Sequence, residues 1–262
     1  MADGAEGAGK ALSDLVTERV SSFDGTGLAV HRLGAGRPVL LLHGLFSTAE
    51  VNWIKFGHAQ KLADAGFEAI MPDLRAHGLS GKPHDPAAYP DDVLAQDVAA
   101  LVDTLGLEEF DLVGFSLGAR TAVRAVINGL RPRRLVLAGM GLEGLAGWNR
   151  RAAFFIDAID RFDLIKRGDA AFMAMSFMKT MKIDRVAARL LLQSVADTEP
   201  VQLSALTMPT MVLCGDKDND NGSAQKLVEA LPNAQYVEIP GTHMSSVTEA
   251  AMGDALVRFL NG

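Results

Sequence analysis

The sequence predicts an α/β protein whose mostly parallel sheet is covered by helices on both faces. Two observations carry this prediction. Short apolar runs alternate along the chain with segments of helical periodicity, and the run at residues 39–42 is apolar at every position rather than at every second one. A strand that is buried on both faces has this composition, because helices pack against each side of a parallel sheet. Hydrophobic residues make up 48% of the 262 residues, which is enough for a sizeable core.

The predicted elements follow one another in a regular order. Residues 1–12 are small and acidic, and we expect a flexible tail there. Residues 16–23 and 28–33 have the pattern of a β-hairpin around an Asp-Gly-Thr-Gly turn. Strands and helices then alternate, as in chains of βαβ units. The remaining strands are expected at 39–42, 68–71, 110–113, 134–138, 210–214 and 235–239, and helices at 58–65, 91–105, 117–127, 224–231 and 249–260.

One long stretch between two predicted strands has no strand pattern. At residues 140–200 apolar residues recur at helical spacing, and many are phenylalanine or methionine. We expect a helical cap there, over an α/β core formed by residues 13–139 and 201–262. Flexible methionine side chains suit an adaptable apolar pocket beneath such a cap. Its charged residues are expected to lie on a solvated surface rather than in an anion site; they are Arg150, Arg151, Asp157, Asp160, Arg161 and Asp163.

Composition excludes several classes of partner. The formal net charge is −7 and no long run of lysine and arginine occurs, so a nucleic-acid partner is not expected. No apolar run is long enough to span a membrane, and the first residues lack the pattern of a signal peptide.

Cys214 is the only cysteine, which rules out an intrachain disulfide and suits a reducing compartment. We therefore expect a cytoplasmic protein; its oligomeric state is left open.

The chemistry concentrates at residues 114–118, which read Gly-Phe-Ser-Leu-Gly. A predicted strand precedes this G-x-S-x-G pattern and a helical pattern follows it, which is the strand–turn–helix setting of a nucleophilic serine. Glycines on either side allow the strand and helix to pack closely. The start of a helix also favours the negative charge that develops during acyl transfer. The alternative is a tight turn in which Ser116 only caps the helix.

A serine nucleophile needs a base, and the base needs an acid that orients it. His243 is the best candidate of the six histidines, because it follows the last predicted strand at the carboxyl edge, where active sites of open α/β sheets form. His31, His58 and His84 lie in a strand, a helix and a proline-containing loop, and we expect them to be structural or solvated.

Three aspartates compete for the role of the acid. Asp216, Asp218 and Asp220 all follow the penultimate strand at the same edge. Their spacing does not decide between them, and the cluster could instead form a solvated turn or a weak cation site. The chain order of serine, aspartate and histidine agrees with the order that this sheet topology requires.

Four landmarks together resemble the α/β-hydrolase superfamily over nearly the whole chain after the tail. They are His43-Gly44 after an apolar strand, the segment 73–80, the serine motif and the pair formed by the aspartate loop and His243. The resemblance implies a catalytic triad of Ser116, Asp218 and His243. It also implies that the backbone N–H groups of Leu45 and Leu117 form an oxyanion hole, that His43 and His77 are architectural, and that no cofactor or metal is needed.

Within this superfamily the chain resembles small carboxylesterases with a helical cap. Epoxide hydrolases and haloalkane dehalogenases carry aspartate where this chain has Ser116, so the resemblance disfavours those activities. It implies a serine hydrolase that cleaves carboxylic esters of small to medium apolar substrates through an acyl-enzyme. The alternatives are a carbon–carbon bond hydrolase, a lactonase or a perhydrolase on the same residues, or a ligand receptor with slow turnover.

Overall fold

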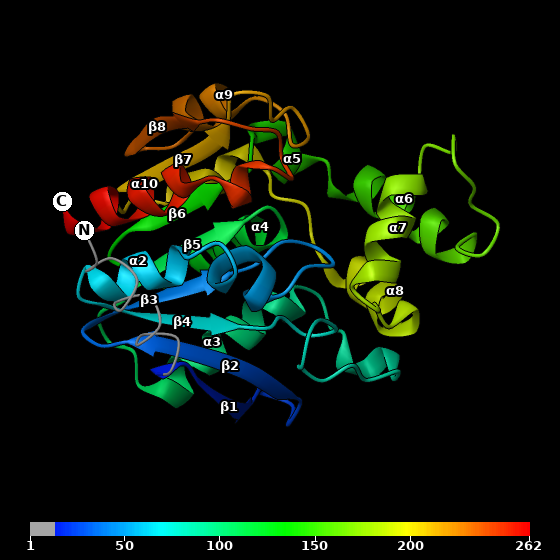
Figure 1. Cartoon of the computed structure of the whole chain (residues 1–262), viewed down its shortest axis with the longest axis horizontal. Coiled ribbons are helices and arrows are strands. Elements are labelled where there is room, and N and C mark those ends of the chain that lie inside the picture. Colours follow the sequence, from blue (N-terminus) through cyan, green and yellow to red (C-terminus); the bar gives the residue numbers. More distant parts are fainter. Residues whose placement is uncertain (1–13) are drawn as a thin grey trace, which may run out of the picture.

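The computed structural model describes residues 14–262, which form an eight-stranded sheet with helices on both faces (Figure 1). The strand order is β1-β2-β4-β3-β5-β6-β7-β8. β1, β2 and β4 pair antiparallel in turn, and every pair from β4 to β8 is parallel. The prediction of a mostly parallel sheet covered on both faces is therefore confirmed. The predicted tail, residues 1–12, lies outside the described residues.

The elements lie close to their predicted positions. The strands are β1 (Val16–Ser21), β2 (Gly27–Gly34), β3 (Arg37–Leu42), β4 (Phe67–Pro72), β5 (Asp111–Phe115), β6 (Leu135–Ala138), β7 (Thr210–Gly215) and β8 (Ala234–Ile239). The helices around the sheet are α2 (His58–Asp64), α3 (Val93–Leu105), α4 (Leu117–Ile127), α9 (Ala224–Ala230) and α10 (Ala250–Asn261). A short π-helical turn, η2 (Glu50–Ile54), was not predicted.

The all-apolar strands are explained by the two layers of helices. Leu40 and Leu42 of β3 belong to the core cluster under α3, α4 and α9. Val39 and Leu41 point to the opposite face, into the cluster under α2 and α10. All four side chains are fully buried. Because both faces of β3 are covered, every position from Val39 to Leu42 is apolar.

Four further helices lie between β6 and β7. They are α5 (Leu142–Ala146), α6 (Trp148–Asp160), α7 (Phe172–Thr180) and α8 (Arg185–Ser194), and we call residues 142–194 the helical insertion. In Figure 1, α6, α7 and α8 gather to one side of the sheet, beyond the carboxyl ends of the parallel strands. Buried residues of the insertion, among them Trp148 and Leu191, belong to the same core cluster as α4.

One buried arginine attaches the helical insertion to α4. Arg120 is only 1% exposed. Its guanidinium donates hydrogen bonds to the carbonyl oxygens of Leu145 (2.9 Å), Ala196 (3.2 Å) and Gly144. Gly144 and Leu145 lie at the start of the insertion, and Ala196 lies just after its end. It also lies 4.8 Å from the ring centroid of Trp148. Burial lowers the pKa of Arg120 to about 10, so the guanidinium stays charged near neutral pH.

Among residues 14–262, no helix combines the length and the apolar character needed to cross a lipid bilayer.

We predict that Arg120→Met destabilises the protein by about 3 kcal/mol, because it leaves one buried and two partly buried carbonyl oxygens without their donor. Urea unfolding followed by circular dichroism measures this loss. Arg131→Met is the matched control, since Arg131 also donates to two carbonyl oxygens but is exposed. The control should lose less than about 1 kcal/mol. Equal losses in the two variants would contradict the anchoring role of Arg120.

Candidate active site

Ser116 lies on a sharp turn between β5 and α4. Its backbone has φ 53° and ψ −110°, a conformation that residues other than glycine rarely adopt. Two glycines make the turn sterically possible. A Cβ at Gly118 would lie 2.1 Å from the carbonyl oxygen of Leu42, and a Cβ at Gly114 would lie 2.3 Å from that of Gly118. The tight packing of strand and helix therefore requires glycine at both positions.

The serine hydroxyl begins a chain of hydrogen bonds. Ser116 Oγ lies 3.0 Å from His243 Nε2, and His243 Nδ1 lies 2.9 Å from Asp218 Oδ2. His243 follows the end of β8 by four residues, and the ring of Phe115 stacks on it with the centroids 4.9 Å apart. When Nδ1 donates to the carboxylate, Nε2 is left as an acceptor that faces the hydroxyl.

The three aspartates of the β7 loop make different contacts. Only Asp218 contacts His243. Asp216 is exposed, and its Oδ1 accepts a hydrogen bond from the backbone N–H of Gly241 at 2.7 Å. Asp220 is also exposed, and its backbone carbonyl accepts from Arg151. Within the described part of the chain, no group of three or more His, Cys, Asp or Glu side chains is placed to hold a metal ion.

Two backbone amides near Ser116 have no hydrogen-bond acceptor within the described residues. Leu117 is the first residue of α4, so its N–H has no acceptor within the helix. The N–H of Leu45 has no acceptor among residues 14–262. Leu45, Leu117 and Ser116 line one small hollow. This geometry suits an oxyanion hole, whose donors must be free and close to the nucleophile.

The loop that carries Leu45 is held by its neighbours on both sides. The N–H of Gly44 donates to Asn52 Oδ1 at 2.9 Å, and the N–H of Phe46 donates to His77 Nε2 at 2.9 Å. Phe46 has φ 59°, so the loop turns back through a left-handed residue. The Leu45 amide thus lies between two backbone N–H groups, those of Gly44 and Phe46, that are each held by a hydrogen bond.

His43 and His77 join this loop to the loop after β4. His43 Nε2 accepts from the N–H of Leu74 at 2.9 Å, and His77 Nδ1 donates to the carbonyl of Arg75 at 2.9 Å. The two rings lie edge to face, 5.1 Å apart. Burial lowers the pKa of both histidines, that of His77 to about 3, so both are neutral acceptors near neutral pH. These contacts agree with an architectural role.

The other histidines lie away from the serine. His31 pairs with Thr17 and Asp73, and buried His58 lies 2.7 Å from the carbonyl oxygen of Val247. His84 is exposed beside Asp184. These are the structural and solvated positions that the sequence predicted.

Two asparagines of the site were missed. Asn52, in η2, is 2% exposed and orients Gly44. Asn221 is buried, and its Nδ2 donates to the carbonyl of Gly139 at 2.7 Å, which ties the β7 loop to the end of β6. The sequence feature that could have predicted a role for Asn52 is its position as the one polar residue in the apolar run Val-Asn-Trp-Ile. A buried polar side chain must be hydrogen-bonded, so this position called for a partner.

A cavity of about 500 Å³ opens beside Ser116 and His243. Its walls come from the loop after β3, from η2, from the loop of His243, from α6 and α7, and from Asp220 of the β7 loop. They are mainly apolar and include Leu45, Phe46, Phe155, Met173, Phe177, Met244 and Val247. Phenylalanine and methionine of the helical insertion therefore line the cavity, while Met178 is buried in the core instead.

Arg151 is an exception to the expected placement of charges. The prediction that the charged residues of the insertion lie on a solvated surface is wrong for this residue. Arg151 is half-buried and lines both the 500 Å³ cavity and the small hollow beside Ser116. The first turns of α6 point it inward, which apolar periodicity alone did not reveal.

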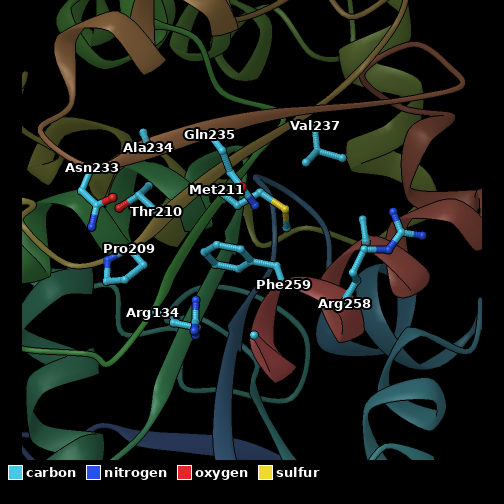
Figure 2. A pocket seen from close by; sticks show the side chains of 12 residues that line it. Arg134, Pro209, Thr210, Met211, Asn233, Ala234, Gln235, Val237, Arg258 and Phe259 are labelled. Carbon is cyan, nitrogen blue, oxygen red and sulfur yellow. The ribbon is translucent and has the colours of Figure 1, made fainter.

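A second cavity, of about 560 Å³, lies at the opposite end of the strands (Figure 2). Its lining includes Thr210 and Ala234, the first residues of β7 and β8, and Arg134 just before β6. Arg134 lies over the ring of Phe259, 5.3 Å from its centroid. None of the three residues of the hydrogen-bonded chain borders this cavity, so we place the candidate active site at the carboxyl edge.

Comparison with known proteins agrees with this architecture. A family model described as "alpha/beta hydrolase fold" matches residues 37–136. The AB hydrolase superfamily protein YisY of Bacillus subtilis (strain 168) is 39% identical over 98 residues, which cover 37% of this chain and 34% of that protein. An epoxide hydrolase of Caballeronia sordidicola is 35% identical over 123 residues, which cover 45% of this chain and 36% of that protein. The chain thus spans about a third of the length of these two relatives.

A solved structure extends the likeness to the whole fold. The crystal structure of a hydrolase from Pseudomonas aeruginosa PA01 superimposes with a TM-score of 0.73 at 24% identity, covering 94% of this chain and 98% of that chain. Together with the sheet order and the family match, this shows that the chain is an α/β-hydrolase-fold protein.

Substitution of His77 by glutamine tests whether this imidazole stays neutral in the folded protein. Glutamine can still accept from the N–H of Phe46 but does not titrate. The pKa of His77 falls from 6.5 to about 3 on folding, so its stabilising contribution is complete above 6.5 and is lost as the pH falls through this window. The stability advantage of the wild type over His77→Gln should therefore shrink by about 1 kcal/mol per pH unit below 6.5.

Urea unfolding of both proteins over this pH range measures the difference. A stability difference that does not change with pH would show that His77 takes up a proton equally well in the folded and unfolded states.

Proposed function

We propose that the protein is a serine hydrolase that cleaves carboxylic esters of small to medium apolar substrates through an acyl-enzyme. One observation carries the proposal. The hydrogen-bonded chain from Ser116 through His243 to Asp218 lies beside two free backbone amides at an apolar cavity. A nucleophile, a base, an acid and an oxyanion hole are the groups that acyl transfer requires.

In the acylation step, Ser116 Oγ attacks the carbonyl carbon of the ester while His243 Nε2 takes its proton. The carboxylate of Asp218 holds the ring orientation and stabilises the imidazolium that forms. The N–H groups of Leu45 and Leu117 donate to the oxyanion. The C–O bond to the alcohol then breaks, and the alcohol leaves with the proton from His243.

In the deacylation step, His243 removes a proton from a water molecule that attacks the acyl-enzyme. The tetrahedral intermediate uses the same two amides. Its collapse releases the carboxylic acid and returns the proton to Ser116 Oγ. These steps need no metal ion and no cofactor. The start of α4 adds to the stabilisation of negative charge at the serine, because helix N-termini carry a partial positive charge.

The cavity supports an apolar acyl or aryl group. Its volume of about 500 Å³ lies within the usual range of small-molecule sites. Phe155, Met173 and Phe177 come from α6 and α7, so we propose that residues 140–200 act as a cap that shapes substrate choice. Serine at the turn favours acyl transfer over epoxide opening, although several relatives are named epoxide hydrolases.

Hydrolysis of p-nitrophenyl butyrate tests the proposal. We expect multiple turnover by the wild type and losses of about 10³-fold or more in kcat for Ser116→Ala and Asp218→Asn. Asp216→Asn is the matched control, because Asp216 is exposed and contacts Gly241 rather than His243. We expect Asp216→Asn to stay within about threefold of the wild type.

Two results would overturn the assignment of residues. One is wild-type turnover by Ser116→Ala; the other is an equal loss in the two aspartate variants. If esters fail, the same variants are to be assayed on lactones and on carbon–carbon cleavage substrates. Turnover confined to one of those classes would replace the ester by that class while keeping Ser116 as the nucleophile.

A further inference from the structure

Arg151 is the one lysine or arginine among the described residues that line the 500 Å³ cavity. It lies in the first turn of α6 and is half-buried. It also borders the small hollow that Ser116 and Leu45 line. A guanidinium therefore lies within the wall that a bound acyl group would touch.

The guanidinium has few partners of its own. Its Nη1 donates to the backbone carbonyl oxygen of Asp220 at 2.8 Å, and Arg151 Cζ lies 5.8 Å from the ring centroid of Phe155. Within residues 14–262, no carboxylate lies within 4.0 Å of it. Three other arginines of the insertion form ion pairs with aspartates; they are Arg161, Arg185 and Arg189.

Burial makes this lack of a partner significant. It lowers the pKa of Arg151, against the opposing effect of the Asp220 and Asp218 carboxylates. The guanidinium nevertheless remains charged, because arginine does not lose its proton under ordinary conditions. Asp220 and Asp218 act on this charge only from beyond 4.0 Å, so no carboxylate among the described residues contacts it directly. A partly desolvated charge without a direct ion pair costs free energy, and a bound anion lowers that cost. Arginine carries five N–H donors, most of which are free here for an incoming group.

We propose that Arg151 binds a carboxylate of the substrate, so that the preferred esters are hemiesters of short dicarboxylic acids. This inference rests on the proposed esterase function and specifies its substrate class. The planar guanidinium matches a carboxylate with two parallel hydrogen bonds. The apolar walls then contact the methylene chain between the carboxylate and the ester carbon at Ser116.

The reaction balances without any further reactant. Monoethyl glutarate transfers its glutaryl group to Ser116 Oγ, and ethanol leaves with the proton from His243. Water then cleaves the glutaryl-enzyme, which gives glutarate and restores the serine hydroxyl. The distal carboxylate is unchanged throughout and serves only to position the acyl group.

The test compares monoethyl glutarate with ethyl hexanoate, a neutral ester of similar length. The measured quantity is the preference, defined as the ratio of the two kcat/KM values. We expect the wild type to prefer monoethyl glutarate, and Arg151→Gln to lower this preference by about 10- to 100-fold, the usual value of a charge-assisted hydrogen bond. Arg151→Lys should recover part of it.

Arg150→Gln is the control, because Arg150 is the exposed neighbour on the same helix and does not border the cavity. It should keep the wild-type preference. An Arg151→Gln variant that loses activity equally on both esters would assign Arg151 a structural role only, and one that keeps the preference would overturn the proposal.

A binding experiment separates this proposal from the esterase proposal. Glutarate binding to Ser116→Ala, measured by calorimetry, does not depend on turnover. If the wild type hydrolyses neither ester but glutarate binds and Arg151→Gln weakens binding about tenfold or more, the carboxylate site stands while the ester reaction fails. If glutarate binds equally with and without the Arg151 charge, the carboxylate site fails.

Discussion

The left-handed backbone at Ser116 is the constraint on which the rest of the site depends. A residue other than glycine adopts such a conformation only where its surroundings hold it there. Here α4 packs against the end of β3 so closely that Gly118 leaves no room for a Cβ atom. This packing carries the serine hydroxyl to the carboxyl edge of the sheet. It also places the Leu117 amide at the start of the helix, next to the hydroxyl.

The amides on either side of Leu45 are held by neutral, buried side chains. Asn52 and His77 fix the two sides of the Leu45 amide. His43 and His77 are suited to this because burial keeps them unprotonated, which leaves one ring nitrogen of each as an acceptor. Arg120, in contrast, is charged, and it donates to backbone carbonyls at the start of the helical insertion and just after its end. This side chain thus joins α4, the helix that follows Ser116, to the insertion that forms part of the cavity wall.

The sequence predicted the elements of the fold because the central strands are apolar on both faces, as β5 and β6 show, and the helices that cover them have an apolar face. Ser116 and His243 were predicted from their positions after strands. The contact of Asp218 with His243 could not be derived from spacing, since it depends on how the loop turns, and Asp216 accepts from Gly241 instead. Asn52, Arg120 and Arg151 were not assigned a role. Whether a polar residue is buried depends on contacts between segments far apart in the chain, and a single sequence does not show these.

The proposed nucleophile can be tested most directly by labelling the wild-type protein with a fluorophosphonate, which reacts with an activated serine. Intact mass spectrometry and peptide mapping would locate the adduct. We expect one adduct per chain, on the peptide that contains Ser116, and no adduct in His243→Ala. An adduct at another residue, or labelling that persists without His243, would contradict the role of Ser116 as a nucleophile activated by this histidine.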